Sequence, residues 1–461
     1  MRDSKQRSLS VLMLPWYAYG HIFPFLELAK QLTRRNFHIY FCSTPVNLNS
    51  IKSKVCKFSN SIKLVELNLP TLPDLPPQYH TTKGLPPHLN ATLHRASDLS
   101  KPDISNMIAT LDPDLVIFDY HVRHWVPSLA FSFNVPAIPF VPTGVGVVSF
   151  VHHYTKIKDR EFPFPELCPD ILKPKLVQLG VTPASSTDQD KEREQDHEDG
   201  DDESVQSSVE TSSYYNTALI KSFRELEGKY IDYLSDSFGL KIIPVGPLVS
   251  DPADQDEEGI CIIDWLDKRE KSSTVFVSFG SECYLSKEDM EEMAYGLELS
   301  NVNFLWIIRF PEGEKMELKD ALPEGFLERV NENGMVVENW APQVKILNHS
   351  SIGGFVSHCG WSSIMESLRF GVPIIAMPIQ HDQPWNAKVV VSSGFGLEVE
   401  RENGKGLERE HVAKVIKQVL VEKIGENIKR KATKMSENMK GKVEEEMMDV
   451  VEKELLQICG M

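Results

Sequence analysis

Residues Trp340 to Gln383 read WAPQVKILNHSSIGGFVSHCGWSSIMESLRFGVPIIAMPIQHDQ and form the most informative segment of this chain. It contains a helical stretch, VKILNH, a short strand-like run, IGGFVSH, the start of a further helix after Gly360, and a second strand-like run, PIIAMPI. This order predicts parallel strands that alternate with helices. Ligands bind beyond the carboxyl ends of strands in such sheets, so the residues that follow the two strands are candidate contacts.

Polar residues follow both of these predicted strands. His358, Ser362 and Ser363 surround the first strand-to-helix turn, where free backbone N–H groups and the helix dipole form a site for an anionic phosphate. The diphosphate of a nucleotide sugar fits such a site. Glu366 is expected either to close a capping box on the helix or to reach ribose hydroxyls. Three polar residues lie near the carboxyl end of the second strand: His381, Asp382 and Gln383.

The whole segment, without a gap, resembles the signature of the plant secondary product glycosyltransferases, and the likeness extends through nearly the whole chain. One position departs from the family, which usually has Asn where this chain has Ser362; a hydroxyl still donates to phosphate, but with shorter reach. The resemblance implies a UDP-sugar donor site made by Trp340, Ala341, Gln343, His358, Gly360, Trp361, Ser362, Ser363, Glu366, Asp382 and Gln383.

The resemblance also implies a role for individual residues of the segment. Trp340 is expected to stack on uracil, His358 to hold the diphosphate and Glu366 to bind the ribose. Asp382 and Gln383 are expected to bind sugar hydroxyls. Trp361 would lie beside the sugar, and Gln343 matches a nucleotide contact, although a Gln ahead of an apolar helical stretch is equally compatible with a solvated side chain.

Strand-like and helix-like segments alternate along both halves of the chain, which predicts an α/β fold. The resemblance implies the GT-B architecture, with two Rossmann-like parallel-sheet domains that face each other across a cleft. We expect an acceptor-binding domain over residues 1–243, a linker over 244–262, a UDP-sugar-binding domain over 263–445 and a C-terminal helix over 446–461 that packs back on the first domain. The predicted strands are SLSVLML, FHIYFCST, DLVIFDY, AIPFV, STVFVSFGS, NFLWIIRF, GMVVENW, GGFVSH and PIIAMPI.

Charge is concentrated in one segment of this 461-residue chain. The formal net charge is −17, and ten acidic against two basic residues between Asp188 and Glu203 supply roughly half of it. This run lacks the apolar side chains needed for packing, so we expect a disordered surface loop at about 184–213. A dedicated interaction or regulatory segment is the alternative interpretation. Neither a basic stripe nor an RNA-type aromatic motif is present, so nucleic-acid binding is not expected.

The remaining composition indicates a soluble cytoplasmic protein. The N-terminal apolar run VLMLPW is shorter than a secretory core, and no run reaches the roughly 18 apolar residues of a spanning helix. Seven cysteines without a CxxC pair indicate neither a disulfide framework nor a zinc site. We expect a monomer without stable membrane insertion and without a metal cofactor.

His21, in LPWYAYGHIFPFLELAK, is the candidate catalytic base. Transfer of a sugar to a hydroxyl requires removal of the acceptor proton, and a neutral imidazole suits this task. A position at or just before the start of a helix disfavours the imidazolium form. A capping or surface role is the structural alternative, but the matching family residue is the catalytic base. Gly20, which precedes it, is included among the donor-binding residues.

Asp119, in DLVIFDYHVRHW, is the candidate partner of His21. A carboxylate behind the imidazole would stabilise the imidazolium that forms during the reaction. Asp119 ends an apolar strand and would face the same region as His21 if the two strands are parallel and adjacent; the alternative is a loop-facing cap. The family's His-orienting Asp aligns with Asp119. Asp112 and Asp114 are interpreted as turn formers.

Two further polar residues follow predicted strands. Ser281, after Gly280, is expected to meet the diphosphate, and its alternative role is a cap for the helix that follows. Thr143, in FVPTGVG, matches a family position that touches the donor sugar, although turn chemistry explains the residue equally well.

Together these residues predict an inverting transferase. The acceptor oxygen would attack the face opposite UDP, and His358, Ser363, Ser281 and the helix start would stabilise the leaving diphosphate without a metal. UDP-glucose is the expected donor, because Gln383 favours glucose by resemblance, whereas relatives also use rhamnose, xylose and glucuronic acid.

The acceptor side most resembles a subgroup that extends sugar chains on small-molecule glycosides such as those of terpenoids or flavonoids. The segments that carry this likeness are ELNLPTLPDLPPQYHTTKGLPPHL and LPWYAYGHIFPFLELAKQL. Direct glucosylation of an aglycone hydroxyl is the alternative. Trp16, Tyr17 and Tyr19 are expected either to stack on the acceptor or to pack.

Two other classes of protein fit these residues less well. A non-catalytic nucleotide-sugar sensor would need neither His21 nor Asp119, and both are present. An NAD-dependent oxidoreductase would carry a glycine fingerprint after its first strand, where this chain reads PWYAYGHIFP.

Overall fold

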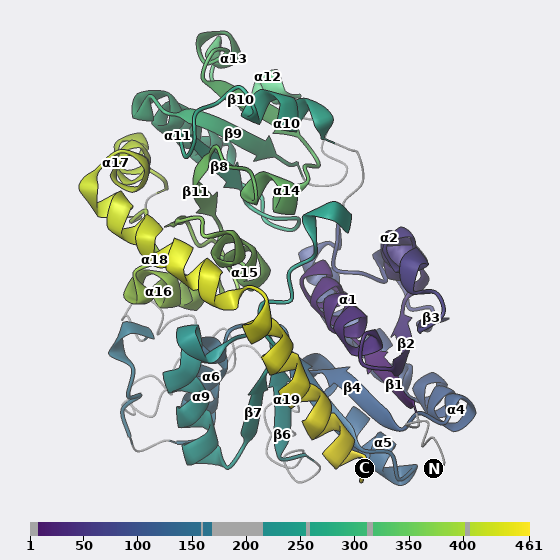
Figure 1. The fold of residues 1–461 in the computed structure, drawn as a ribbon. Helices are drawn as coiled ribbons and strands as arrows, with labels where there is room; N and C mark the ends of the chain where they lie inside the picture. The colour runs from purple at the N-terminus through teal and green to yellow at the C-terminus, as the bar shows by residue number, and fades with distance from the viewer. Residues whose placement is uncertain (1–7, 158–159, 168–214, 255–258, 311–316, 402–405) are drawn as a thin grey trace, which may run out of the picture. The chain divides into compact units, whose positions relative to one another are not determined.

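The computed structural model of this chain describes residues 8–157, 160–167, 215–254, 259–310, 317–401 and 406–461. The expected acidic loop at about 184–213 lies outside the described residues. The chain divides into two compact units, one of Met1–Leu248 with Glu445–Met461 and one of Val249–Glu444. Each unit is an α/β domain built on its own parallel sheet (Figure 1).

The N-terminal unit contains a seven-stranded sheet of order β3-β2-β1-β4-β5-β6-β7, in which every pairing is parallel. The strands are β1 (Leu9–Leu14), β2 (Phe37–Ser43), β3 (Ile62–Glu66), β4 (Leu115–Asp119), β5 (Ala137–Val141), β6 (Thr217–Ile220) and β7 (Lys241–Pro244). Its helices are α1 (Tyr19–Thr33), α2 (Pro45–Val55), α3 (Asn90–Leu99), α4 (Lys101–Leu111), α5 (Val126–Ser132), α6 (Val145–Lys156), α9 (Arg224–Phe238) and α19 (Lys442–Ile458).

The C-terminal unit contains a six-stranded parallel sheet of order β10-β9-β8-β11-β12-β13. The strands are β8 (Thr274–Ser278), β9 (Asn303–Ile308), β10 (Gly334–Glu338), β11 (Ile352–Ser357), β12 (Ile374–Ala376) and β13 (Gly396–Glu398). Its helices are α10 (Ile260–Leu266), α11 (Lys287–Ser300), α12 (Leu318–Ala321), α13 (Phe326–Arg329), α14 (Gln343–Leu347), α15 (Trp361–Phe370), α16 (Gln383–Ser393), α17 (Arg409–Leu420) and α18 (Lys423–Met439).

The buried strands form because their sequences are almost continuously apolar, as expected for parallel sheets covered on both faces. β1, β4, β8 and β11 contain nearly only buried residues. Alternate residues of β1 belong to two different cores: Val11 and Met13 face the core that includes helix α1, whereas Leu12 and Leu14 face the core that includes α3 and α4. The predicted α/β class and both predicted sheets are therefore confirmed.

Helix α19, the yellow helix at the C-terminus, belongs to the N-terminal unit (Figure 1). Its apolar side chains Met448, Val451 and Leu455 are buried in the core that also contains the apolar side chains of α1. Arg35 Nη2 pairs with Asp449 at 2.9 Å, and Lys241 Nζ pairs with Glu454 at 2.5 Å. The last helix of the chain thus completes the fold of its first domain.

No helix in the described part of the chain combines the length and the apolar character that crossing a membrane requires.

Candidate active site

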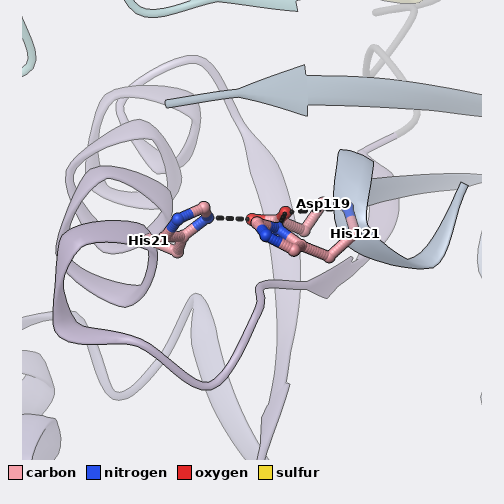
Figure 2. A group of neighbouring side chains, drawn as sticks. All are labelled: His21, Asp119 and His121. Carbon is pink, nitrogen blue, oxygen red and sulfur yellow. Dashed lines mark hydrogen bonds and ion pairs between the residues drawn. The ribbon is translucent and has the colours of Figure 1, made fainter. Parts of the chain in front are cut away.

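The carboxyl ends of β1 and β4 bring His21 and Asp119 together in the N-terminal unit. The two strands pair in parallel, with Leu14 opposite Phe118, so Asp119 follows at the edge where the β1–α1 loop begins. His21 is the third residue of α1, slightly further into the helix than the sequence indicated. His21 Nδ1 lies 2.7 Å from Asp119 Oδ2 (Figure 2).

This geometry determines the role of each nitrogen of His21. Near neutral pH Asp119 is a carboxylate that only accepts, so the hydrogen bond requires the proton of a neutral His21 to be on Nδ1. Nε2 is then the unprotonated nitrogen of the ring and the atom that can take a proton. The His21 side chain retains 20% exposure, whereas Asp119 is completely buried. The arrangement is that of a general base with a carboxylate behind it.

Asp119 remains ionised despite its burial. Burial alone would raise its pKa, but the charge of His21 and the hydrogen bonds from His121 and His21 outweigh this effect and hold the pKa well below its usual range. The carboxylate is therefore available to stabilise a positive charge on His21.

A second histidine, His121, contacts the other oxygen of the same carboxylate. His121 Nδ1 lies 2.8 Å from Asp119 Oδ1, and the His121 main-chain N–H donates to Oδ1 at 3.1 Å. Figure 2 shows the carboxylate between the two imidazoles. The sequence analysis did not identify His121, because its position depends on the short 3₁₀ turn Tyr120–Val122 that follows β4.

The described residues contain one group of three or more side chains that could hold a metal ion, namely His21, Asp119 and His121. The ligand atoms of these three side chains all lie within 4.8 Å of one another. Each imidazole nitrogen nevertheless lies at a hydrogen-bonding distance from its own carboxylate oxygen, 2.7 and 2.8 Å. A proton occupies each of these short gaps, whereas a zinc ion would need a position about 2.0–2.1 Å from both nitrogens. The contacts therefore fit proton sharing.

The aromatic residues ahead of His21 mostly pack inside the unit. Trp16 and Tyr17 are each only 5% exposed. Trp16 stacks on His94 and on His121, with ring centroids 4.3 and 5.0 Å apart. Tyr17 is hydrogen-bonded to Ser97 at 3.2 Å, and burial raises its pKa. Of the two alternatives for these residues, packing is correct for Trp16 and Tyr17.

Thr143 lies at the carboxyl end of β5, immediately before Gly144, the N-cap of α6. The first turn of α6 is held by the buried carboxylate of Glu227, which accepts from the main-chain N–H groups of Val145 and Gly146 at 2.9 and 2.8 Å and from Ser222 Oγ at 2.6 Å. A fixed helix start therefore sets the position of Thr143. Gly20 is exposed in the first turn of α1 and has open space around its Cα.

The donor-site candidates of the C-terminal unit follow the carboxyl ends of four strands of one sheet. Ser281 follows β8, His358 follows β11, Asp382 and Gln383 follow β12, and the Trp340–Gln343 turn follows β10. Because β10, β9, β8, β11 and β12 are successive neighbours and all parallel, these strands end along the same edge. The structure therefore places the predicted donor residues on one side of this unit.

His358 is 9% exposed and lies against two glycines. A Cβ at Gly280, where φ is +77°, would be 2.7 Å from the His358 ring, and a Cβ at Gly360 would be 2.5 Å from Nε2. Burial first, and then the charge of Arg309, lower the pKa of His358 to about 4, so the ring is neutral at physiological pH. His358 Nδ1 is buried without a hydrogen-bond partner in the described structure. A neutral ring with an unused nitrogen fits a contact to phosphate.

Helix α15 begins at Trp361, and its N-cap is Gly360, without a side-chain cap. The capping-box alternative for Glu366 is therefore wrong. Instead, Gln343 Nε2 donates to Glu366 Oε2 at 2.7 Å and to Ser363 Oγ at 3.2 Å. Gln343 thus links α14 to α15 and is not simply solvated. Ser362 is half-buried in the same first turn, and Ser363 is 7% exposed.

The two tryptophans of the segment differ in exposure. Trp340 is 45% exposed, which leaves a ring face available for stacking, while Ala341 beside it is 8% exposed. Trp361 is only 4% exposed. The helix-cap alternative for Ser281 is wrong, because Ser286 caps α11 by accepting from Asp289 N at 3.0 Å.

The amide of Gln383 is held on both sides by the protein. Its Oε1 accepts from the main-chain N–H groups of Ile379 and Gln380, both at 2.9 Å, and its Nε2 donates to Cys283 Sγ at 3.2 Å. Asp382 accepts from Asn386 Nδ2 at 3.0 Å. The role of Cys283 was not identified from the sequence, because this residue lies in a loop 100 residues before Gln383.

Comparison with known proteins assigns this arrangement to a class. The structure aligns with the crystal structure of a Glycyrrhiza uralensis protein complexed with glycyrrhetinic acid 3-O-monoglucuronide, with a TM-score of 0.80 and 22% identity over 98% of this chain and 96% of the other. The fold is that of the GT-B glycosyltransferases, as the sequence predicted.

The sequence comparisons identify the family. Residues 251–438 match the family described as UDP-glucoronosyl and UDP-glucosyl transferase, and residues 7–126 match the glycosyltransferase N-terminal domain. Among similar proteins, mogroside IIIx synthase of Siraitia grosvenorii is 49% identical over 94% of this chain and 89% of its own length. Beta-D-glucosyl crocetin beta-1,6-glucosyltransferase of Gardenia jasminoides is 48% identical over 91% and 92%. The chain belongs to the UDP-glycosyltransferase family, and it is a UDP-glycosyltransferase.

Proposed function

We propose that this enzyme transfers glucose from UDP-glucose to a sugar hydroxyl of a small-molecule glycoside, with inversion and without a metal ion. The observation that carries the proposal is the 2.7 Å contact between His21 Nδ1 and the buried carboxylate of Asp119. With the proton of the neutral ring on Nδ1, this contact leaves Nε2 unprotonated as the base, and it supplies a counter-charge for the imidazolium.

In the proposed reaction, His21 Nε2 takes the proton of the acceptor hydroxyl while the acceptor oxygen bonds to the anomeric carbon of glucose. The bond between that carbon and the UDP oxygen breaks, and its electron pair leaves with UDP. Attack on the face opposite UDP converts the α-linked donor into a β-linked product. The proton remains on His21, where Asp119 stabilises the charge, until it is released to solvent.

The leaving diphosphate gains negative charge as this bond breaks, so donors must be in place before the reaction. We assign this role to His358, Ser281, Ser363 and the main-chain N–H groups at the start of α15. The buried, unpartnered Nδ1 of His358 supports the assignment. Trp340 would stack on uracil, and Glu366 would bind the ribose. Asp382, Gln383, Trp361 and Thr143 would contact the glucose.

A glycoside acceptor is supported by the names of similar proteins. Beta-D-glucosyl crocetin beta-1,6-glucosyltransferase is named for an acceptor that already carries glucose. We assign acceptor binding to the N-terminal unit, which holds His21, and donor binding to the C-terminal unit. A cytoplasmic monomer that acts in plant specialised metabolism is the form we propose.

The test is mass-spectrometric product analysis with UDP-glucose, offering an aglycone and its monoglucoside side by side. Glucose added to the monoglucoside by the wild type, and no product from His21→Ala, is the expected result. Addition chiefly to the aglycone would overturn the acceptor assignment, and unchanged turnover in His21→Ala would overturn the mechanism.

Metal independence is tested separately with EDTA. We expect full activity after dialysis against the chelator. Activity lost on dialysis and restored by a divalent cation would refute this part of the proposal.

A further inference from the structure

His121 is a partly buried histidine, with 21% of its side chain exposed, that the proposed mechanism does not use, although it makes two contacts with Asp119. We propose that His121 is a positioning residue, which locks the Asp119 carboxylate so that Oδ2 stays directed at His21. This inference rests on the proposed role of His21 as the base.

The contacts leave the carboxylate a single orientation. Asp119 Oδ1 accepts twice from His121, from the ring at 2.8 Å and from the main chain at 3.1 Å, while Oδ2 accepts from His21 at 2.7 Å. Rotation of the carboxylate would break all three bonds at once. Because Asp119 is completely buried, bulk water cannot replace these hydrogen bonds. The orientation of Asp119 therefore depends on His121.

The ring of His121 is itself fixed. It stacks on the buried ring of Trp16, with centroids 5.0 Å apart and an interplanar angle of 16°. Its edge meets His21, with centroids 4.9 Å apart at 71°. A continuous series of side-chain contacts thus runs from Trp16 through His121 and Asp119 to His21. Figure 2 shows the last three of these residues.

A neutral donor is the appropriate group at this position. Burial lowers the pKa of His121 to about 4, against the opposing effect of Asp119, so the ring is neutral. Its Nδ1–H group therefore donates a hydrogen bond without adding a charge. The other ionisable groups around it are His21 on α1, His94 on α3 and Tyr120 in its own 3₁₀ turn. A cation here would oppose the imidazolium that His21 forms during transfer. His121 therefore restrains Asp119 without cancelling its charge.

The test compares His121→Leu, which removes the ring donor, with His121→Asn, whose amide nitrogen replaces Nδ1. We expect His121→Leu to lose about 10²-fold in kcat/KM through misplacement of the base, and His121→Asn to stay within about tenfold of wild type. The hydrogen bond from His121 also weakens the attraction between the Asp119 carboxylate and the imidazolium of His21. Without this bond the imidazolium is more stable, so the acid limb of the pH profile of His121→Leu should move to higher pH by about one unit. UDP affinity should not change in either variant.

His124→Leu is the matched control. His124 lies three residues further along and pairs with another carboxylate, Asp98, at 2.8 Å. We expect its kcat/KM and pH profile to match those of the wild type. Circular dichroism and melting temperature will show whether each variant is folded.

A double-mutant cycle with Asp119→Asn distinguishes positioning from a general structural role. If His121 acts through Asp119, adding His121→Leu to Asp119→Asn should reduce the rate by less than about threefold. The inference would be overturned if the two losses were additive, or if His121→Asn were as impaired as His121→Leu. It would also be overturned if the purified enzyme held a stoichiometric metal ion that His121→Leu loses. If His121→Leu behaves as wild type while His21→Ala is inactive, only this inference fails; an active His21→Ala would instead refute the proposed base.

Discussion

The two site regions of this enzyme are assembled in different ways. In the C-terminal unit, most candidate donor contacts come from one contiguous segment, Trp340–Gln383, in which each strand is followed within a few residues by its candidate polar residues. In the N-terminal unit, His21 and Asp119 are 98 residues apart and meet only because β1 and β4 pair. The comparison indicates that the proposed donor site is encoded locally, whereas the proposed acid–base pair depends on the topology of the sheet.

If this division is correct, a change at His21 or Asp119 should affect the chemical step, and a change in the segment Trp340–Gln383 should affect donor affinity. The variants below test whether the two effects separate.

Asp119→Asn is expected to have the largest effect among them. The amide carries no charge to stabilise the imidazolium, and its NH₂ group can donate a hydrogen bond to His21 Nδ1, which favours the wrong tautomer of His21. We expect kcat to fall about 10³-fold, with little change in the Kd of UDP measured by calorimetry. Asp112→Asn is the control, since Asp112 is an exposed residue in the left-handed conformation after α4, which Asn also adopts readily. Weakened UDP binding in Asp119→Asn would contradict the division.

Trp340→Ala tests the other region. Its half-exposed ring is proposed to stack on uracil, and loss of one stacking contact should raise the Kd of UDP about tenfold or more. At saturating donor, kcat should fall far less than in Asp119→Asn. Trp340→Phe retains an aromatic face and should bind UDP nearly as the wild type does. Equal affinities in Trp340→Ala and the wild type would remove Trp340 from the site.

The smallest effects concern pH and stability, where the two units contain buried groups with opposite shifts. In the N-terminal unit, burial raises the pKa of Glu227 to about 7, so its contribution to stability is present at acid pH and is lost as pH rises through about 7. In the C-terminal unit, the lowered pKa of His358, about 4, means that stability is lost as pH falls from about 6.5 toward 4.

Urea unfolding at a series of pH values checks these signs when the wild type is compared with Glu227→Gln and His358→Asn. Between pH 4.5 and 7, the free energy of unfolding of the wild type should fall relative to that of Glu227→Gln as pH rises. Over the same range it should fall relative to that of His358→Asn as pH decreases. Each change should be roughly 1 kcal/mol per pH unit. Differences of the opposite sign would show that these groups are not buried as described.

The same contrast explains what the sequence could predict. Strands such as β1, β4, β8 and β11 were found because they are buried apolar runs bounded by polar residues. β3, β6, β7 and β13 were not predicted; they are short or lie toward the sheet margins, and Lys63 and Glu66 in β3 interrupt its apolar pattern. The segment Trp340–Gln383 carries a local signal, which the structure places along one sheet edge.

The residues that were missed depend on contacts that no local pattern encodes. His121 acquires its position from the 3₁₀ turn after β4 and from the ring of Trp16. Cys283 reaches Gln383 from the loop after β8. A histidine two residues after Asp119, or one cysteine in a loop, has no distinctive spacing of its own. Such residues can be identified only after the sheet order is known.

The most direct test of the account measures two properties of His21→Ala together: the Kd of UDP by calorimetry and the single-turnover rate of glucose transfer. If His21 is the base, the transfer rate should be at least about 10³-fold below wild type, with UDP affinity unchanged. A transfer rate near that of the wild type, or a loss of UDP binding equal to the loss of rate, would contradict it.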